Sequence, residues 1–131
     1  MYTGKCMYRK EMIHIFFFYW VPLLCYMILI FYLSHQSKPF GGLIVEPADK
    51  VLHFIEFFVF SFLALRAFQG SSLSIIRKHF LFISIIFSIF YAFSDEFHQA
   101  FVYNRRSSVL DFCADSLGVL VGSYLFRNNV L

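Results

Sequence analysis

Charge is scarce in this chain. Only 15% of its 131 residues are charged, whereas 60% are hydrophobic. A soluble domain of this size exposes much of its surface to water and cannot hide so many large apolar side chains. The basic residues are spread between hydrophobic segments and form no continuous basic face, which nucleic-acid binding would require. The composition therefore indicates one membrane domain over residues 1–131, and we predict no nucleic-acid partner.

Cysteine is equally sparse. The three cysteines, Cys6, Cys25 and Cys113, form no C-x-x-C pair, and two of them lie within apolar segments. Buried free thiols of this kind behave as small hydrophobes. The absence of paired cysteines excludes a disulfide framework and a cysteine-based zinc cluster. No other spacing in the chain matches a recognised metal motif, so we predict neither a metal site nor a cofactor.

What the chain has instead is four long apolar segments. They predict helices over residues 13–33, 48–68, 79–102 and 109–126. Their lengths are close to the roughly 20 residues that cross the hydrocarbon of a bilayer. Pro22 lies inside the first segment and is expected to kink it, which neighbouring helices tolerate. The predicted fold is all-α, a bundle of four transmembrane helices.

The distribution of basic residues predicts the orientation. If the N-terminus is cytoplasmic, seven lysines and arginines lie inside and four lie outside. This bias favours an arrangement with both termini in the cytoplasm. The inner residues are Lys5, Arg9, Lys10, Arg66, Arg77, Lys78 and Arg127, and the outer residues are Lys38, Lys50, Arg105 and Arg106.

In this orientation the polar residues that flank the apolar segments all lie at the outer side. An ionisable group in hydrocarbon is costly, so a chain that retains several is expected to use them. We therefore predict one polar site at one mouth of the bundle. Its clusters are residues 34–37; Asp49, Lys50, His53 and Glu56; Asp95, Glu96 and Gln99; and Arg105, Arg106, Asp111 and Asp115.

Helical spacing groups these residues by face. Asp49, His53 and Glu56 follow the i, i+4, i+7 pattern and share one stripe of the second helix. Glu56 lies roughly 10 Å along the helix axis from Asp49, which puts it inside the membrane boundary. His98 points away from the stripe of Asp95 and is expected to be an interfacial histidine.

The fourth helix carries a similar stripe. Asp111 and Asp115 are followed at helical spacing by Gly118 and Gly122, a Gly-x-x-x-Gly pattern that lets helix backbones approach closely. We interpret the glycines as a packing device, and they also offer a face for a homo-oligomer. Ser108-x-x-Asp111 fits a helix-capping pattern, so Asp111 has a purely structural alternative.

A structural alternative exists for the whole cluster as well. Lys50, Arg105 and Arg106 can neutralise the acids and lock the helices together as an ion-pair network. The depth of Glu56 and Asp115 argues against this alternative, because a small bundle has less costly ways to pack.

Four stretches resemble the VanZ-like family of membrane proteins. Residues 49–57, DKVLHFIEF, are similar to its D-K-x-x-H-F-x-E-[YF] signature, and residues 91–99, YAFSDEFHQ, to its Y-[GA]-x-S-D-E-x-H-Q stretch. Residues 105–118 match R-x-x-S-x-x-D-x-x-A-[DN]-x-x-G, and SHQS at 34–37 resembles the S-S-Q-S after the family's first helix. The resemblance covers about residues 30–122.

The resemblance implies a small polytopic protein of the bacterial inner (cytoplasmic) membrane. The founding member of the family is linked to resistance to the glycopeptide antibiotic teicoplanin. One departure is that Tyr103-Asn104 replaces the family's common Pro-Gly before the motif arginine. Asn104 can still adopt the left-handed conformation that a turn requires. Arg106 adds a charge that many relatives lack.

Three functions remain open from the sequence. The first is an outward-facing pocket for a cell-envelope lipid headgroup, an anionic lipid-linked precursor or a glycopeptide, with Arg105 as a bidentate clamp on an anion. The second is an enzyme that uses His53, Glu56 and Glu96 in acid-base chemistry on a lipid-linked substrate. The third is a structural scaffold or subunit of an envelope complex. The predicted ligand-binding residues are Asp49, Lys50, His53, Glu56, Asp95, Glu96, Gln99, Arg105, Asp111 and Asp115.

Overall fold

The computed structural model describes residues 13–37, 48–105 and 107–130. Every regular element in these residues is a helix, and four helical spans, Ile13–Ser34, Ala48–Gln69, Phe80–Gln99 and Val109–Asn129, are long and apolar enough to cross a membrane. The predicted all-α fold with four transmembrane helices is therefore confirmed. The elements are η1 (Phe16–Trp20), α2 (Val21–Ser34), α3 (Ala48–Gln69), α4 (Ser74–Lys78), α5 (Phe80–Gln99) and α6 (Val109–Val130).

The first span contains a short π-helix, η1, directly before Pro22. A proline inside a helix lacks an N–H, and its ring clashes with the carbonyl four residues earlier. In η1 the hydrogen bonds are wider, and the Val21 N–H donates to the Phe16 carbonyl five residues back. Such π-bulges are a common way for a helix to absorb a local irregularity. The structure thus shows a change of helix type in the turn before Pro22, while the kink expected there stays a prediction.

Two boundaries differ from the predicted ones, and one element was missed. The third span ends at Gln99 and not at residue 102, because the following N–H groups of Phe101 and Val102 bond three residues back in tight turns. Asn104 then takes a positive φ of 60°, as expected for the turn. α6 continues to Val130, four residues beyond its predicted end, and the short α4 was not predicted.

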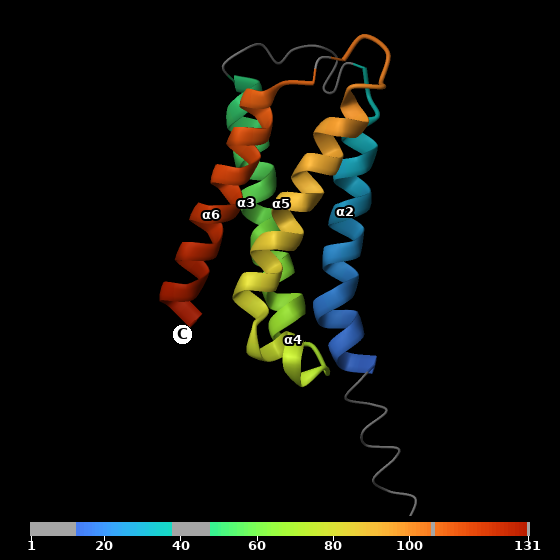
Figure 1. Cartoon of the computed structure of the whole chain (residues 1–131). Coiled ribbons are helices and arrows are strands. Elements are labelled where there is room, and N and C mark those ends of the chain that lie inside the picture. The colour runs from blue at the N-terminus through green and yellow to red at the C-terminus, as the bar shows by residue number, and fades with distance from the viewer. Residues whose placement is uncertain (1–12, 38–47, 106, 131) are drawn as a thin grey trace, which may run out of the picture.

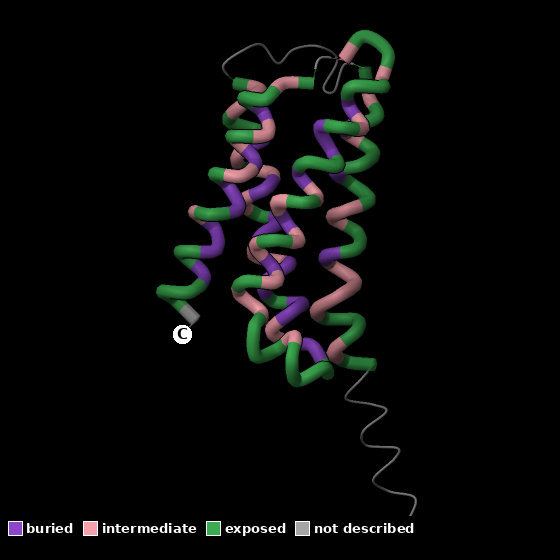
Figure 2. The backbone as a smooth tube through the Cα atoms, in the orientation of Figure 1, coloured by how far each residue is buried: buried purple, intermediate pink, exposed green. Residues whose placement is uncertain are grey.

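The four spans run side by side in an up-and-down bundle. Figure 1 shows that the end of α2, the start of α3, the end of α5 and the start of α6 lie together at one end of the bundle. The buried apolar residues lie along the surfaces where the helices face one another (Figure 2), and α3 supplies the largest share of this core. The four polar clusters of the sequence therefore lie at the same end of the bundle.

The glycines of α6 bring it against α3. A Cβ added at Gly118 would collide with the Phe54 backbone oxygen and lie 3.0 Å from the Phe58 backbone nitrogen. A Cβ at Gly122 would lie 2.9 Å from the Phe58 oxygen and collide with Ser61 Oγ. The two glycines therefore have the predicted packing role, and the helix that packs against them is α3 of the same chain. The homo-oligomer stays a prediction, and the glycines that suggested it already have a packing partner.

Candidate functional site

The polar end of the bundle has a buried centre to which all four spans contribute. Asp115 of α6 is 0% exposed, and Ser34 of α2, His53 of α3 and Asp95 of α5 are each 5% exposed or less. Ionisable groups buried among membrane helices require partners, since hydrocarbon supplies none. Two groups of polar contacts provide these partners.

The first group is centred on His53. Its Nδ1 lies 3.0 Å from Asp115 Oδ1 and 4.0 Å from Glu96 Oε1. These three side chains come from α3, α6 and α5, and all are buried. Helical spacing had grouped His53 and Asp115 with other polar residues on one face of their helices but had assigned no face to Glu96. The contact among the three depends on how the helices pack.

Lys50 and Asp111 form an ion pair beside this centre, with 3.2 Å between Lys50 Nζ and Asp111 Oδ1. The capping alternative for Asp111 is wrong, because the Ser108 backbone N–H donates instead to Glu96 Oε2 at 3.0 Å. Glu96 therefore reaches across from α5 to satisfy an amide at the start of α6. Such amides have no partner within their own helix.

The second group joins α5 to α2. Ser34 Oγ donates to Asp95 Oδ1 in a short hydrogen bond, and Gln99 Nε2 donates to Asp95 Oδ2 at 2.7 Å. Arg105 Nε in turn donates to Gln99 Oε1 at 2.8 Å. Both oxygens of Asp95 are thereby satisfied. The partnership with Ser34 was not predicted, and its only sequence signal is the SHQS stretch.

Arg105 ties the loop after α5 to the end of α2. Its Nη1 donates to the backbone oxygens of Leu33 at 2.8 Å and Gln36 at 3.0 Å. Carbonyls at a helix end lack partners within the helix, which explains why a guanidinium binds there. Nη2 of Arg105 takes part in none of these bonds, so this nitrogen can still contact the predicted anion. Arg106 lies outside the described residues.

Glu56 and Asp49 complete the predicted set at this end. Glu56 is half-buried, and its carboxyl group is close enough to Asp95, His53 and Asp115 to interact with them electrostatically. Asp49 is half-buried at the start of α3 and lies near His53 and Asp111. All ten predicted ligand-binding residues therefore lie at the same end of the bundle, and whether they bind a ligand stays a prediction.

Histidines form a separate pair at the rim. His35 Nδ1 lies 3.3 Å from His98 Nε2, and the His98 ring lies 4.6 Å from the ring of Phe31. His98 is half-buried, and these contacts are with residues at or next to the end of the first span. Its contact with His35 was not predicted, since the two residues are 63 positions apart.

Three buried carboxylate oxygens make no hydrogen bond with the described residues. They are Glu96 Oε1, Asp111 Oδ1 and Asp115 Oδ2. Lys50 approaches the second of them as an ion pair. A buried acceptor without a donor costs about 1–3 kcal/mol, more when charged. Glu96 Oε1 and Asp115 Oδ2 can therefore each accept a hydrogen bond or contact a cation.

A groove of about 230 Å³ lies beside Glu96. It lies where α5 ends and α6 begins, and Glu96 is the only ionisable residue in its lining. The other lining residues are Phe93, Phe97, Ala100, Ser107, Ser108, Val109 and Phe112. An apolar groove with one carboxylate at its wall suits a ligand with an apolar body and a polar head.

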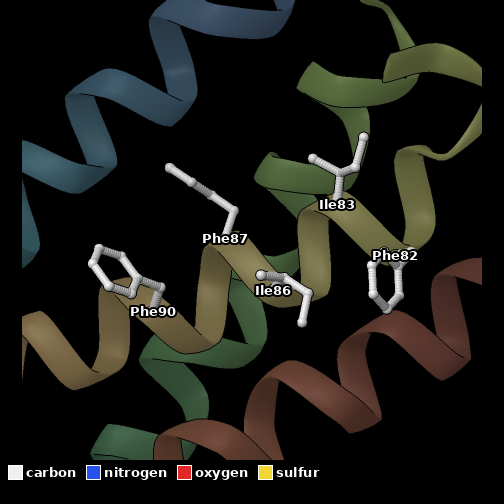
Figure 3. A pocket seen from close by; sticks show the side chains of 5 residues that line it. All are labelled: Phe82, Ile83, Ile86, Phe87 and Phe90. Atoms are coloured by element: carbon white, nitrogen blue, oxygen red, sulfur yellow. The ribbon is translucent and has the colours of Figure 1, made fainter. Parts of the chain in front are cut away.

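A second hollow, of about 340 Å³, lies further along α5 (Figure 3). All of the residues that line it are apolar: Phe82, Ile83, Ile86, Phe87 and Phe90. It can hold hydrocarbon but offers no side-chain group for a polar head. The polar site is therefore associated with the first groove.

Comparison with protein families gives a match over most of the chain. The model of a family described as VanZ/LLP1 matches residues 9–131, nearly the whole chain. No curated protein and no solved structure matches the chain.

Proposed function

Because the chain belongs to the VanZ/LLP1 family, we propose that it binds the head group of a cell-envelope lipid at the outer face of the bacterial cytoplasmic membrane. Its termini lie in the cytoplasm, and its polar end faces outwards. The excess of basic residues at the opposite end supports this orientation.

The groove beside Glu96 carries this proposal. It joins a surface that lies within the membrane to a buried carboxylate whose Oε1 has no hydrogen bond. A lipid can place its chain along Phe93 and Phe97 and its head beside Glu96 without leaving the bilayer. A water-soluble ligand would have no use for this apolar approach.

The chemistry of the site favours a head group that has hydroxyl or amine donors and a phosphate. The donors match the acceptor oxygens of Glu96 and Asp115. Lys50 and Nη2 of Arg105 supply positive charge for an anion. A lipid-linked peptidoglycan precursor has both features. A glycopeptide with a lipid tail, such as teicoplanin, has sugars and a chain and is the alternative occupant.

Blocking the groove tests the proposal. In Val109→Trp an indole fills the groove at a position that is 79% exposed. We expect wild-type protein in nanodiscs of bacterial lipid extract to retain about one lipid per chain in native mass spectrometry, and Val109→Trp to lose it at least tenfold. The control is Val51→Trp, a lipid-facing position of α3 that is 55% exposed and outside the groove. Equal retention by the three proteins would contradict the proposal.

A second candidate, an enzyme that acts on the same lipid, rests on one contact. The buried hydrogen bond of 3.0 Å between His53 and Asp115 orients the imidazole as in other acid-base sites. Glu56 and Glu96 are its further acid-base candidates. A catalytic role predicts that His53→Gln keeps the lipid bound in the same native-mass assay and accumulates it unreacted. Loss of lipid binding in this variant would favour the binding function alone.

A further inference from the structure

Carboxyl groups outnumber lysine and arginine side chains at the polar end, among the residues that the structure describes. Among the described residues at this end, six carboxyl groups accompany two basic side chains, Lys50 and Arg105. The hydrogen bonds of Arg105 go to Gln99 and to two backbone carbonyls, and Lys50 lies 3.2 Å from Asp111. The carboxyl groups are those of Asp49, Glu56, Asp95, Glu96, Asp111 and Asp115.

Three of the buried groups are arranged like ligands of one ion. His53, Glu96 and Asp115 each offer one atom, and these atoms all lie within 4.8 Å of one another. Nδ1 of His53 lies 3.0 Å from the Asp115 oxygen and 4.0 Å from the Glu96 oxygen. Atoms bound to a common ion at roughly 2.0–2.2 Å lie about 3–4 Å apart, so a small shift of the Glu96 side chain is sufficient.

The unpartnered oxygens point to the same conclusion independently. Glu96 Oε1 and Asp115 Oδ2 belong to side chains that are more than nine-tenths buried, and neither oxygen makes a hydrogen bond with the described residues. Both carboxylates face His53. The contact between His53 Nδ1 and Asp115 Oδ1 leaves Glu96 Oε1, 4.0 Å from the same nitrogen, without a partner. A divalent cation bound by the three side chains would satisfy this oxygen as well.

We propose that His53, Glu96 and Asp115 form a binding site for one divalent cation. A mixed set of imidazole and carboxylate ligands suits Zn²⁺ or Mn²⁺ better than a hard ion such as Ca²⁺, which prefers oxygen alone. The neighbouring group of Asp49, His53 and Asp111 is less suited, because Asp49 is only half-buried and Asp111 already has Lys50.

The cation would also have a use in the proposed lipid binding. Glu96 belongs both to this site and to the lining of the groove. The bound ion would lie at the inner end of the groove and supply positive charge to the phosphate of a lipid head. This last step rests on the proposed function, whereas the cation site itself does not.

Zinc binding tests the site without any lipid. The full chain, purified in detergent without a histidine tag, is stripped with EDTA, loaded with Zn²⁺ and desalted, and the metal is counted by mass spectrometry. The variant His98→Gln disrupts the exposed His35–His98 pair and so controls for zinc bound there. We expect one zinc per chain in wild type and in His98→Gln, and less than one-tenth of this in Glu96→Gln and Asp115→Asn.

Asp49→Asn and Asp111→Asn are the matched controls and are expected to keep their zinc. No zinc in wild type, or zinc retained by Glu96→Gln, would overturn the proposal, as would loss confined to His98→Gln. Wild-type protein gives a second measurement that does not depend on how the variants fold, since Zn²⁺ must raise its melting temperature above that in EDTA. An unchanged melting temperature would also overturn the site, and the test with Val109→Trp would still stand on its own.

Discussion

Gly118→Ala is expected to lower the free energy of unfolding by about 3 kcal/mol, towards the upper end of overpacking costs. The added Cβ meets only backbone atoms of Phe54 and Phe58, so no side-chain rotation relieves the clash. α6 would have to move away from α3. Unfolding in a series of SDS concentrations, followed through the fluorescence of Trp20, the only tryptophan, measures the change.

Gly70→Ala is the matched control for this variant. A Cβ there would lie 3.0 Å from the ring of Tyr19, which can rotate, and 3.3 Å from the Arg66 carbonyl oxygen. We expect a loss below about 1 kcal/mol. A similar cost for both glycines would show that α6 does not pack against α3 as closely as described.

Glu96→Gln is expected to raise the stability of the metal-free protein by about 1–2 kcal/mol. The amide oxygen can still accept the Ser108 N–H, and the new NH₂ group faces His53 and Asp115, where the carboxylate has an unpartnered charged oxygen. The same variant removes a group that belongs to both the proposed lipid site and the proposed cation site. A gain in stability with a loss of function is typical of residues kept for binding. The SDS titration in EDTA measures the gain.

Asp95→Asn is the neighbouring comparison. Both oxygens of Asp95 accept hydrogen bonds, from Ser34 and Gln99, so replacing one oxygen by NH₂ creates a mismatch. We expect a loss of about 1 kcal/mol. If Glu96→Gln destabilises the protein as Asp95→Asn does, the centre is a structural ion-pair network, and the reading of Glu96 as a binding group is wrong.

The sequence was sufficient to predict the four membrane spans and to predict that the polar groups lie at one end of the bundle. Apolar length predicted four helices, and helical spacing assigned His53 and Asp115 to inward faces. Spacing fixes the face of a helix but not the residue opposite it. The contacts of His53 with Asp115 and of Ser34 with Asp95 therefore emerged only when the helices were packed.

The same limit explains two differences in detail. Arg105 was predicted to bind an external anion, but its Nη1 donates to the backbone carbonyls of Leu33 and Gln36 at the end of α2. The proposed cation site was not predicted, because the three side chains that would hold the ion come from three helices and form no local motif. Motif reading finds ligands that share one segment, and membrane bundles commonly distribute theirs over facing helices.

The central claim is that the polar side chains of four membrane helices share one end of the bundle and that this end faces outwards. Labelling of single cysteines in intact cells with a membrane-impermeant maleimide tests it most directly, in a chain whose three native cysteines are replaced by serine. Ser37→Cys and Tyr103→Cys lie at the polar end, and Ile75→Cys and Asn128→Cys lie at the opposite end. We predict labelling of the first two and protection of the last two until the cells are opened. Labelling of Ser37→Cys together with Ile75→Cys, or of the opposite pair alone, would contradict the account.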